Sequence, residues 1–191
     1  MELRERILDA AAKVYAETGF RGATTRRIAD RAGVNEITLF RHFGSKTRLL
    51  HEAIRCAGLA SNLCHLPDRP AHPRSELLAW AMAIYRELFD RRSLIRTAMG
   101  ELEERPDLLP PEESQTVCAG QELHVYLERL KSGGLIGAEV DLMAATTMFM
   151  GTLFADAISR DVIPAMYRQD PATSIGQYVD LIARALDLKE S

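Results

Sequence analysis

One stretch near the N-terminus, residues 24–46 with the sequence TTRRIADRAGVNEITLFRHFGSK, constrains the fold more than any other part of the chain. Ile28, Ala29 and Ala32 place small and apolar side chains on one face of a short helix. Gly33 follows, and glycine turns a chain sharply after a helix because it tolerates positive φ. The pattern therefore predicts two short helices joined by a tight turn.

The second of these helices has an inward and an outward face. Asn35 is placed to cap it by accepting a hydrogen bond from a free backbone N–H. Leu39 and Phe43 lie four residues apart, so both side chains face inward. The outward face carries Glu36, Thr38, Arg41 and His42. This arrangement is typical of a helix-turn-helix, whose second helix lies in the major groove of DNA.

The distribution of charge supports a nucleic-acid partner, although the net charge of the 191 residues is only −3. Residues 1–51 hold ten lysines and arginines against six acids, a net charge of +4. The remaining residues hold 14 against 21, a net charge of −7. A basic N-terminal part on an acidic body indicates that the N-terminal part faces phosphate groups.

Cysteine usage and hydropathy indicate a soluble cytoplasmic protein without a membrane span. Cys56, Cys64 and Cys118 are odd in number and widely spaced, which does not suggest a disulfide framework. The N-terminal MELRER lacks the apolar region of a signal peptide. The longest uncharged run, residues 142–155, is shorter than the roughly 20 residues that span a bilayer.

The rest of the chain is predicted to form helices and no sheet, since no stretch alternates with period two, and the three prolines in residues 66–73 predict a loop there. Thr24 or Thr25 caps the second helix, and Ser45 caps the helix that follows the helix-turn-helix. The other predicted helices span 2–18, 46–64, 75–91, 93–104, 112–132, 140–160 and 174–188. Prolines at 164 and 171 break the segment between the last two. The prediction is an all-α protein of about nine helices. A DNA-binding helix-turn-helix domain spans 1–51, and a ligand-binding and dimerisation domain spans 52–191.

The motif IADRAGVNEITLFRHFGSK resembles the DNA-binding signature of the tetracycline-repressor (TetR) family of transcriptional regulators, and the resemblance extends upstream through RERILDAAAKVYAETGFRGATT. The resemblance implies a homodimer that binds double-stranded operator DNA and a small-molecule effector. It matches Thr25, Phe40, His42 and Lys46 to contacting positions of the family. Two positions depart from the pattern: Ile37 stands where a small residue is usual, and Phe40 stands where a tyrosine hydroxyl usually reaches phosphate.

The candidate DNA-binding residues fall into two groups. Glu36 is suited to accept from cytosine N4, Thr38 to touch a thymine methyl or phosphate, and Arg41 to read guanine or bind phosphate. The alternative to a base contact for Glu36 is a structural role, in which its charge stabilises the N-terminus of its own helix. Flanking residues are suited to the DNA backbone. The full set is Thr25, Arg26, Arg27, Asn35, Glu36, Thr38, Phe40, Arg41, His42 and Lys46.

The domain at residues 52–191 is predicted to hold an apolar pocket for an effector. For most of the candidate pocket residues, the alternative is that they pack in the core of the domain. The candidates are Trp80, Phe89, Met99, Leu123, His124, Tyr126, Leu127 and Met148, with His124, Glu101 or Gln121 as polar anchors. The last two helices are predicted to form a four-helix bundle with those of a second copy, and burial in the chain's own core is again the alternative. The candidate interface residues are Leu142, Ala145, Phe149, Leu153, Ile175, Tyr178, Val179, Ile182 and Leu186.

Catalytic and metal-binding patterns are not found. Cys64, His65 and His72 do not fit a zinc spacing, and no nucleophile–base pair or phosphate-binding glycine loop occurs. We therefore expect no cofactor, no metal and no enzymatic activity. The leading hypothesis is a dimeric, ligand-responsive repressor that binds a palindromic operator. The alternatives are a helical ligand-binding module or enzyme that uses the helix-turn-helix only for interaction, and a regulator that has lost DNA binding.

Overall fold

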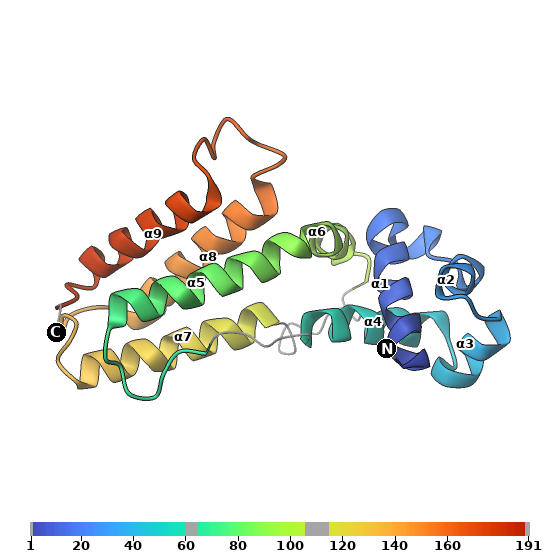
Figure 1. Cartoon of the computed structure of the whole chain (residues 1–191), viewed down its shortest axis with the longest axis horizontal. Coiled ribbons are helices and arrows are strands. Elements are labelled where there is room, and N and C mark those ends of the chain that lie inside the picture. The colour runs from blue at the N-terminus through green and yellow to red at the C-terminus, as the bar shows by residue number, and fades with distance from the viewer. Residues whose placement is uncertain (1, 60–64, 106–114, 190–191) are drawn as a thin grey trace. The chain divides into compact units, whose positions relative to one another are not determined.

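The computed structural model describes residues 2–59, 65–105 and 115–189, and within these ranges the chain forms nine helices and no strand. The all-α prediction is therefore confirmed. The helices are α1 (Leu3–Gly22), α2 (Thr25–Ala32), α3 (Glu36–Phe43), α4 (Lys46–Leu59), α5 (Pro73–Asp90), α6 (Arg92–Glu101), α7 (Gln115–Ser132), α8 (Leu142–Ser159) and α9 (Pro171–Ala185) (Figure 1). The predicted start of α7 at 112–113 lies outside the described residues.

The helices divide into two compact units, which we describe separately. Helices α1 to α4 together with α6 form the N-terminal unit, and α5, α7, α8 and α9 form the C-terminal unit. The predicted domain boundary after residue 51 falls inside α4. The helix at 92–101, which the sequence assigned to the body, packs instead against α1.

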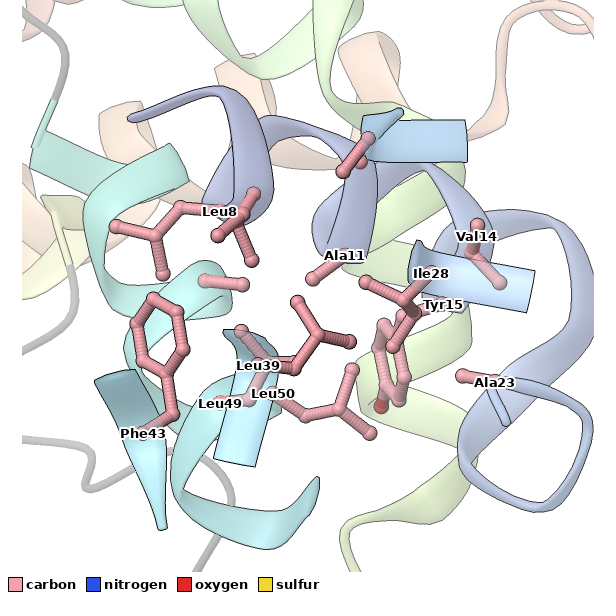
Figure 2. Packing of buried hydrophobic residues seen from close by; sticks show 14 of the residues in the cluster. Leu8, Ala11, Val14, Tyr15, Ala23, Ile28, Leu39, Phe43, Leu49 and Leu50 are labelled. Carbon is pink, nitrogen blue, oxygen red and sulfur yellow. The ribbon is translucent and has the colours of Figure 1, made fainter. Parts of the chain in front are cut away.

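The core of the N-terminal unit gathers apolar side chains from all five of its helices. Figure 2 shows Leu39 and Phe43 of α3 facing side chains of α1 and α4, as their four-residue spacing predicts. Tyr15 of α1 is fully buried among them. The other labelled members are Leu8, Ala11, Val14, Ala23, Ile28, Leu49 and Leu50. This packing holds α3 against α2 and α4 in one core with α1.

A break in α1 lets the end of that helix meet α6. Gly19 has φ 66° and ψ −178°, a conformation that is essentially restricted to glycine. The carboxylate of Glu101 accepts hydrogen bonds from the Phe20 N–H at 2.8 Å and from the Tyr15 hydroxyl at 2.9 Å. Thr97 donates to the Ala16 carbonyl at 3.1 Å. These contacts attach α6 to α1.

The C-terminal unit is held together by a buried polar network as well as by apolar packing. Asp156 of α8 is fully buried. Both oxygens of its carboxylate accept hydrogen bonds from the Arg160 guanidinium at 2.7 Å. The carboxylate also accepts from the Tyr178 hydroxyl at 2.7 Å and from the Tyr85 hydroxyl at 3.1 Å. Arg160 also donates to Ser174 at 3.0 Å. Burial raises the pKa of Tyr85 and of Tyr178 to about 12, and the Asp156 charge adds to both shifts. The network joins α5, α8 and α9.

The last two helices begin at aspartate caps. Asp141 accepts from Ala144 N–H, and Asp170 accepts from Thr173 N–H, each at 3.0 Å. Pro171 was predicted to break the chain before the last helix, but it occupies the first turn of α9, where a missing N–H costs nothing. The final helix therefore starts three residues earlier than predicted.

Helix α8 is apolar enough to raise the question of a membrane span. An 18-residue window covering it has a mean hydropathy of 1.3, and 44% of that window is buried within the chain. Length and composition alone would allow it to cross a bilayer, as they would for a core helix of a soluble protein. Helix α8 packs against α5 and α9, so its apolar side chains contribute to the core of the C-terminal unit.

Candidate nucleic-acid interface

The local geometry of the helix-turn-helix follows the predicted signals closely. Thr24, rather than Thr25, caps α2 by accepting from the Arg27 N–H at 3.3 Å. Gly33 ends α2 in the left-handed conformation, with φ 66° and ψ 41°. Asn35 caps α3 by accepting from the Ile37 N–H at 3.0 Å. The caps and the glycine turn fix the angle between α2 and α3.

Two of the predicted DNA-contacting side chains bind each other. The hydroxyl of Thr25, at the start of α2, donates to the Glu36 carboxylate at 2.7 Å. Both side chains are half-buried. Glu36 therefore holds the first turns of α2 and α3 together, and one of its carboxylate oxygens is already occupied before any base approaches.

The outward face of α3 is more apolar than the sequence pattern suggested. Arg41 and His42 are exposed, as predicted, and Thr38 is half-buried. Ile37 is 73% exposed and Phe40 is 50% exposed, although both are large and apolar. The two residues that depart from the family pattern thus form an apolar surface on the recognition helix.

Several cations remain available on the same unit. Within the described residues, no hydrogen bond or ion pair engages the side chains of Arg26 and Arg41, and both are exposed. Arg27 makes one long hydrogen bond, at 3.3 Å, to the Gly22 carbonyl. Arg48, in the first turn of α4, is also exposed and close to Gly44. Sequence reasoning missed Arg48, although its position two residues after Lys46 places it beside the recognition helix.

Lys46 has a different environment from the one predicted for a phosphate contact. Its ammonium donates to the Phe20 carbonyl at 2.6 Å and lies 4.3 Å from the centre of the Phe20 ring. The guanidinium of Arg105 lies 3.7 Å from the same ring. Burial lowers the pKa of Lys46, and the nearby Arg105 charge lowers it further. The lysine joins α4 to the end of α1, so its main contact is structural.

Half of the predicted effector residues lie in the core of the C-terminal unit. Trp80, Leu123, Tyr126 and Leu127 are at most 1% exposed and belong to the core of the C-terminal unit. Phe89 stacks on Tyr85 with ring centres 5.9 Å apart. Met148 is 68% exposed on α8 and Met99 is 48% exposed on α6, while His124 lies 3.4 Å from Thr146. Glu101, one of the predicted polar anchors, already accepts hydrogen bonds from the Tyr15 hydroxyl and the Phe20 N–H.

A groove of about 640 Å³ lies instead between the loop before α5 and the exposed side of α7. Glu122 at its wall accepts from the Leu66 N–H at 2.9 Å and from the Trp80 indole at 3.2 Å, and lies 3.0 Å from His65. Its lining residues are His65, Leu66, Pro67, Asp68, Cys118, Gln121, Glu122, Val125 and Arg129. Only the predicted anchor Gln121 belongs to it, because periodicity pointed to the opposite, buried side of α7.

The predicted dimer residues are mostly inside the chain's own core. Leu142 and Tyr178 are partly exposed, and Tyr178 is occupied by Asp156. The remaining seven are at most 9% exposed: Ala145, Phe149, Leu153, Ile175, Val179, Ile182 and Leu186. They form the inner stripes that pack α8 and α9 within the C-terminal unit, which is the core-packing alternative of the sequence analysis. The free faces of these helices carry other residues.

A metal site is not supported in the part of the chain that the structure describes. No group of three or more His, Cys, Asp or Glu side chains lies close enough together to hold an ion among those residues. Cys64 falls outside the described ranges, and His65 is occupied by Glu122 at 3.0 Å.

Comparison with known proteins assigns this geometry to a family. Residues 7–53 match the family described as "Bacterial regulatory proteins, tetR family". The HTH-type transcriptional regulator YvkB of Bacillus subtilis is 28% identical over 156 residues, which cover 82% of each chain. The class D tetracycline repressor protein of Escherichia coli is 34% identical over 105 residues, covering 54% of this chain and 46% of that protein.

The fold extends the likeness to the whole chain. The crystal structure of PfmR, a TetR family transcriptional regulator from Thermus thermophilus, has a TM-score of 0.68 and 24% identity. That match covers 97% of this chain and 100% of PfmR, so it includes the C-terminal helices that the family motif leaves out. The capped helix-turn-helix, its exposed cations and these relatives lead to one conclusion: residues 7–53 form a DNA-binding domain of the TetR family, and the chain is a DNA-binding transcriptional regulator.

Proposed function

We propose that the protein is a homodimeric repressor that works in the cytoplasm and binds a palindromic operator with one α3 per half-site. Its relatives include a protein named as a tetracycline repressor. A single helix-turn-helix unit buries too little surface for tight specific binding, and a two-fold dimer places two recognition helices in major grooves about 34–36 Å apart.

The observation that carries the dimer proposal is the outer face of α8. While its inner stripe is buried, Met143 and Met148 are 62% and 68% exposed, and Leu181 on α9 is 58% exposed. The same helix carries small exposed residues at helical spacing, namely Ala144, Thr147, Gly151 and Ala155. Small side chains allow a second helix to approach closely, and exposed methionines gain by being covered. A second copy of the chain is the occupant that a two-fold operator requires.

A charge on this outer face tests the dimer. Met148→Arg should give monomers in sedimentation analysis at micromolar concentration and should weaken operator binding, while the helical circular dichroism signal stays unchanged. Met166→Arg, at a 70% exposed methionine outside both helices, is the matched control. Phe149 is unsuitable for this test because it is 3% exposed, and a charge there would unfold the core. A stable dimer in the Met148→Arg variant would contradict the proposal.

DNA contact is assigned to the exposed cations of the N-terminal unit. Arg26, Arg27, Arg48 and His42 supply phosphate contacts, and Arg41 lies where it reads a base or a phosphate. Arg41→Ala should weaken specific binding by roughly 1–3 kcal/mol if it reads a base. The measurement is the affinity for the selected operator relative to a scrambled duplex, across a series of salt concentrations.

We further propose that a small-molecule effector binds the C-terminal unit and releases DNA. The groove beside α7 is the first place to test, because it combines apolar Leu66 and Val125 with the polar groups of Gln121 and Arg129. A ligand acts only through its different affinities for the DNA-binding and DNA-released states. A release of about 100-fold corresponds to about 2.7 kcal/mol of coupling.

A thermal-shift screen of amphipathic compounds, followed by operator-binding assays with each hit, tests this proposal. Val125→Glu should abolish a hit's thermal shift if the ligand occupies the groove, and Met166→Glu should leave it unchanged. A saturable groove ligand that does not alter operator affinity would contradict the coupling. A ligand unaffected by Val125→Glu would place the site elsewhere.

A further inference from the structure

The N-terminal half of α3 offers a base edge more apolar surface than hydrogen-bonding surface. Ile37 is 73% exposed and Phe40 is 50% exposed. A spacing of three residues puts them side by side on the outward face, away from Leu39 and Phe43 in the core. Neither of the exposed side chains contributes to the buried cluster of this unit.

Two polar side chains at the same end of the helix, Asn35 and Glu36, already have partners. Asn35 caps the helix through the Ile37 N–H at 3.0 Å, and Glu36 accepts from Thr25 at 2.7 Å. A base that used either side chain would compete with a contact that sets the geometry of the helix-turn-helix. Thr38 at this end is half-buried, so the exposed side chain that remains available to read sequence at this end of α3 is Ile37.

The exposed arginines of the same unit indicate which kind of partner binds this apolar surface. Arg26 and Arg41 are exposed on the same unit. Exposed cations on the unit that carries the apolar patch suit DNA, where phosphates flank the groove, better than an apolar protein surface. In the major groove, an aliphatic side chain distinguishes one base feature, the 5-methyl group of thymine.

We propose that Ile37, flanked by Phe40, reads a thymine methyl group in each half-site of the operator. This inference rests on the sequence-specific operator binding proposed above. Burial of one methyl-sized group corresponds to an affinity change of about fourfold, or ~0.8 kcal/mol. Two half-sites in one dimer give about 15-fold if both methyl groups are removed.

Uracil supplies the test, because it differs from thymine only by lacking the methyl group. An operator is first selected from random duplexes with the full-length protein. Each thymine is then replaced by uracil, symmetrically in both half-sites, and the dissociation constant is measured. The wild-type protein should lose about 15-fold affinity at one symmetric pair of positions. Ile37→Ala should bind the thymine operator more weakly and should no longer distinguish it from the uracil operator at that pair.

Two further variants separate methyl recognition from general effects. Ile37→Val keeps a branched apolar side chain and should retain most of the discrimination between thymine and uracil. Leu3→Ala removes another exposed apolar side chain of the N-terminal unit, one that lies on α1, and should leave the discrimination unchanged.

The outcomes that contradict the inference are distinguishable. If selection yields no preferred sequence, the proposed operator function fails and this inference fails with it. If a specific operator is found but no uracil substitution weakens binding, the operator function stands and the methyl contact is refuted. If Ile37→Ala weakens binding to both operators equally, Ile37 contacts the sugar-phosphate backbone, and methyl recognition is again refuted.

Discussion

Replacing Glu101 by alanine should destabilise the N-terminal unit by about 2–4 kcal/mol, even though the residue lies far from the helix-turn-helix in sequence. Its carboxylate is the acceptor for the Phe20 N–H at 2.8 Å and for the hydroxyl of fully buried Tyr15 at 2.9 Å. A buried polar group left without a partner costs about 1–3 kcal/mol. Two such groups give about 2–6 kcal/mol, and entry of water at half-buried Glu101 reduces the upper figure.

The assay combines equilibrium unfolding in urea with hydrogen exchange at the Phe20 amide. Glu101→Ala should lower the unfolding midpoint of the N-terminal unit and speed exchange at that amide. Glu103→Ala is the matched control, because Glu103 is exposed and has no ion pair within the described residues. Surface changes of that kind stay within about 0.5 kcal/mol. Equal stabilities of the two variants would refute the reasoning.

A second substitution approaches the same contact from α1. A Cβ atom on Gly19 would lie 2.8 Å from the Glu101 carboxylate oxygen, and the backbone conformation there is strained for any other residue. Gly19→Ala should therefore cost about 1–3 kcal/mol from the backbone alone. In the background of Glu101→Ala, the steric part of this cost should disappear while the backbone part remains, which a double-mutant cycle measures.

Three further predictions concern the remaining contacts. Asp156→Ala should destabilise the C-terminal unit by about 3–5 kcal/mol, since it leaves Arg160 without its carboxylate, and urea unfolding followed by Trp80 fluorescence checks this against Glu139→Ala. Burial raises the pKa of Glu76, but hydrogen bonds from His72, Tyr126 and Ala71 outweigh burial and lower it below 4.5. Its stabilising contribution should be present above about pH 4.5 and be lost as the pH falls through the lowered pKa, so a pH series of unfolding midpoints should show a smaller acid loss in Glu76→Gln. Lys46→Ala should lower the stability of the N-terminal unit with little change in the salt dependence of DNA binding, whereas Arg26→Ala should reduce the slope of log K against log [salt] by about 0.9 for each phosphate that the variant no longer neutralises.

These predictions place stability and DNA recognition in different side chains of one small unit. Glu101 and Lys46 hold the end of α1 against α6 and α4 through hydrogen bonds to the Phe20 backbone. Arg26, Arg41 and Ile37 are exposed and have no structural role among the described contacts. Substitutions in the second group should therefore change DNA affinity without changing the free energy of unfolding, which makes binding data from them straightforward to interpret.

The sequence by itself determined the helix-turn-helix, because its signals are local. Gly33 needs only its own backbone freedom to turn the chain, and Asn35 reaches an N–H two residues away. The four-residue spacing of Leu39 and Phe43 is enough to define the inward face of α3. Most helix boundaries followed in the same way from caps, prolines and glycines.

The tertiary structure alone decided which face of the C-terminal helices is buried. Helix α8 is apolar on nearly all sides, so periodicity does not separate buried Phe149 from the neighbouring, 68% exposed Met148. The residues that the sequence suggested for the interface therefore lie on the buried face of α8 and α9. Which face is exposed follows only from how α8 packs against α5 and α9.

Long-range contacts set the roles of the charged residues for the same reason. Lys46 meets the carbonyl of a residue 26 positions away, and Glu101 meets an amide 81 positions away. Such contacts depend on how whole helices pack, and sequence spacing carries no information about them. The sequence thus predicted which surface faces DNA, while the tertiary structure decided which side chains of that surface are exposed and without a partner among the described contacts.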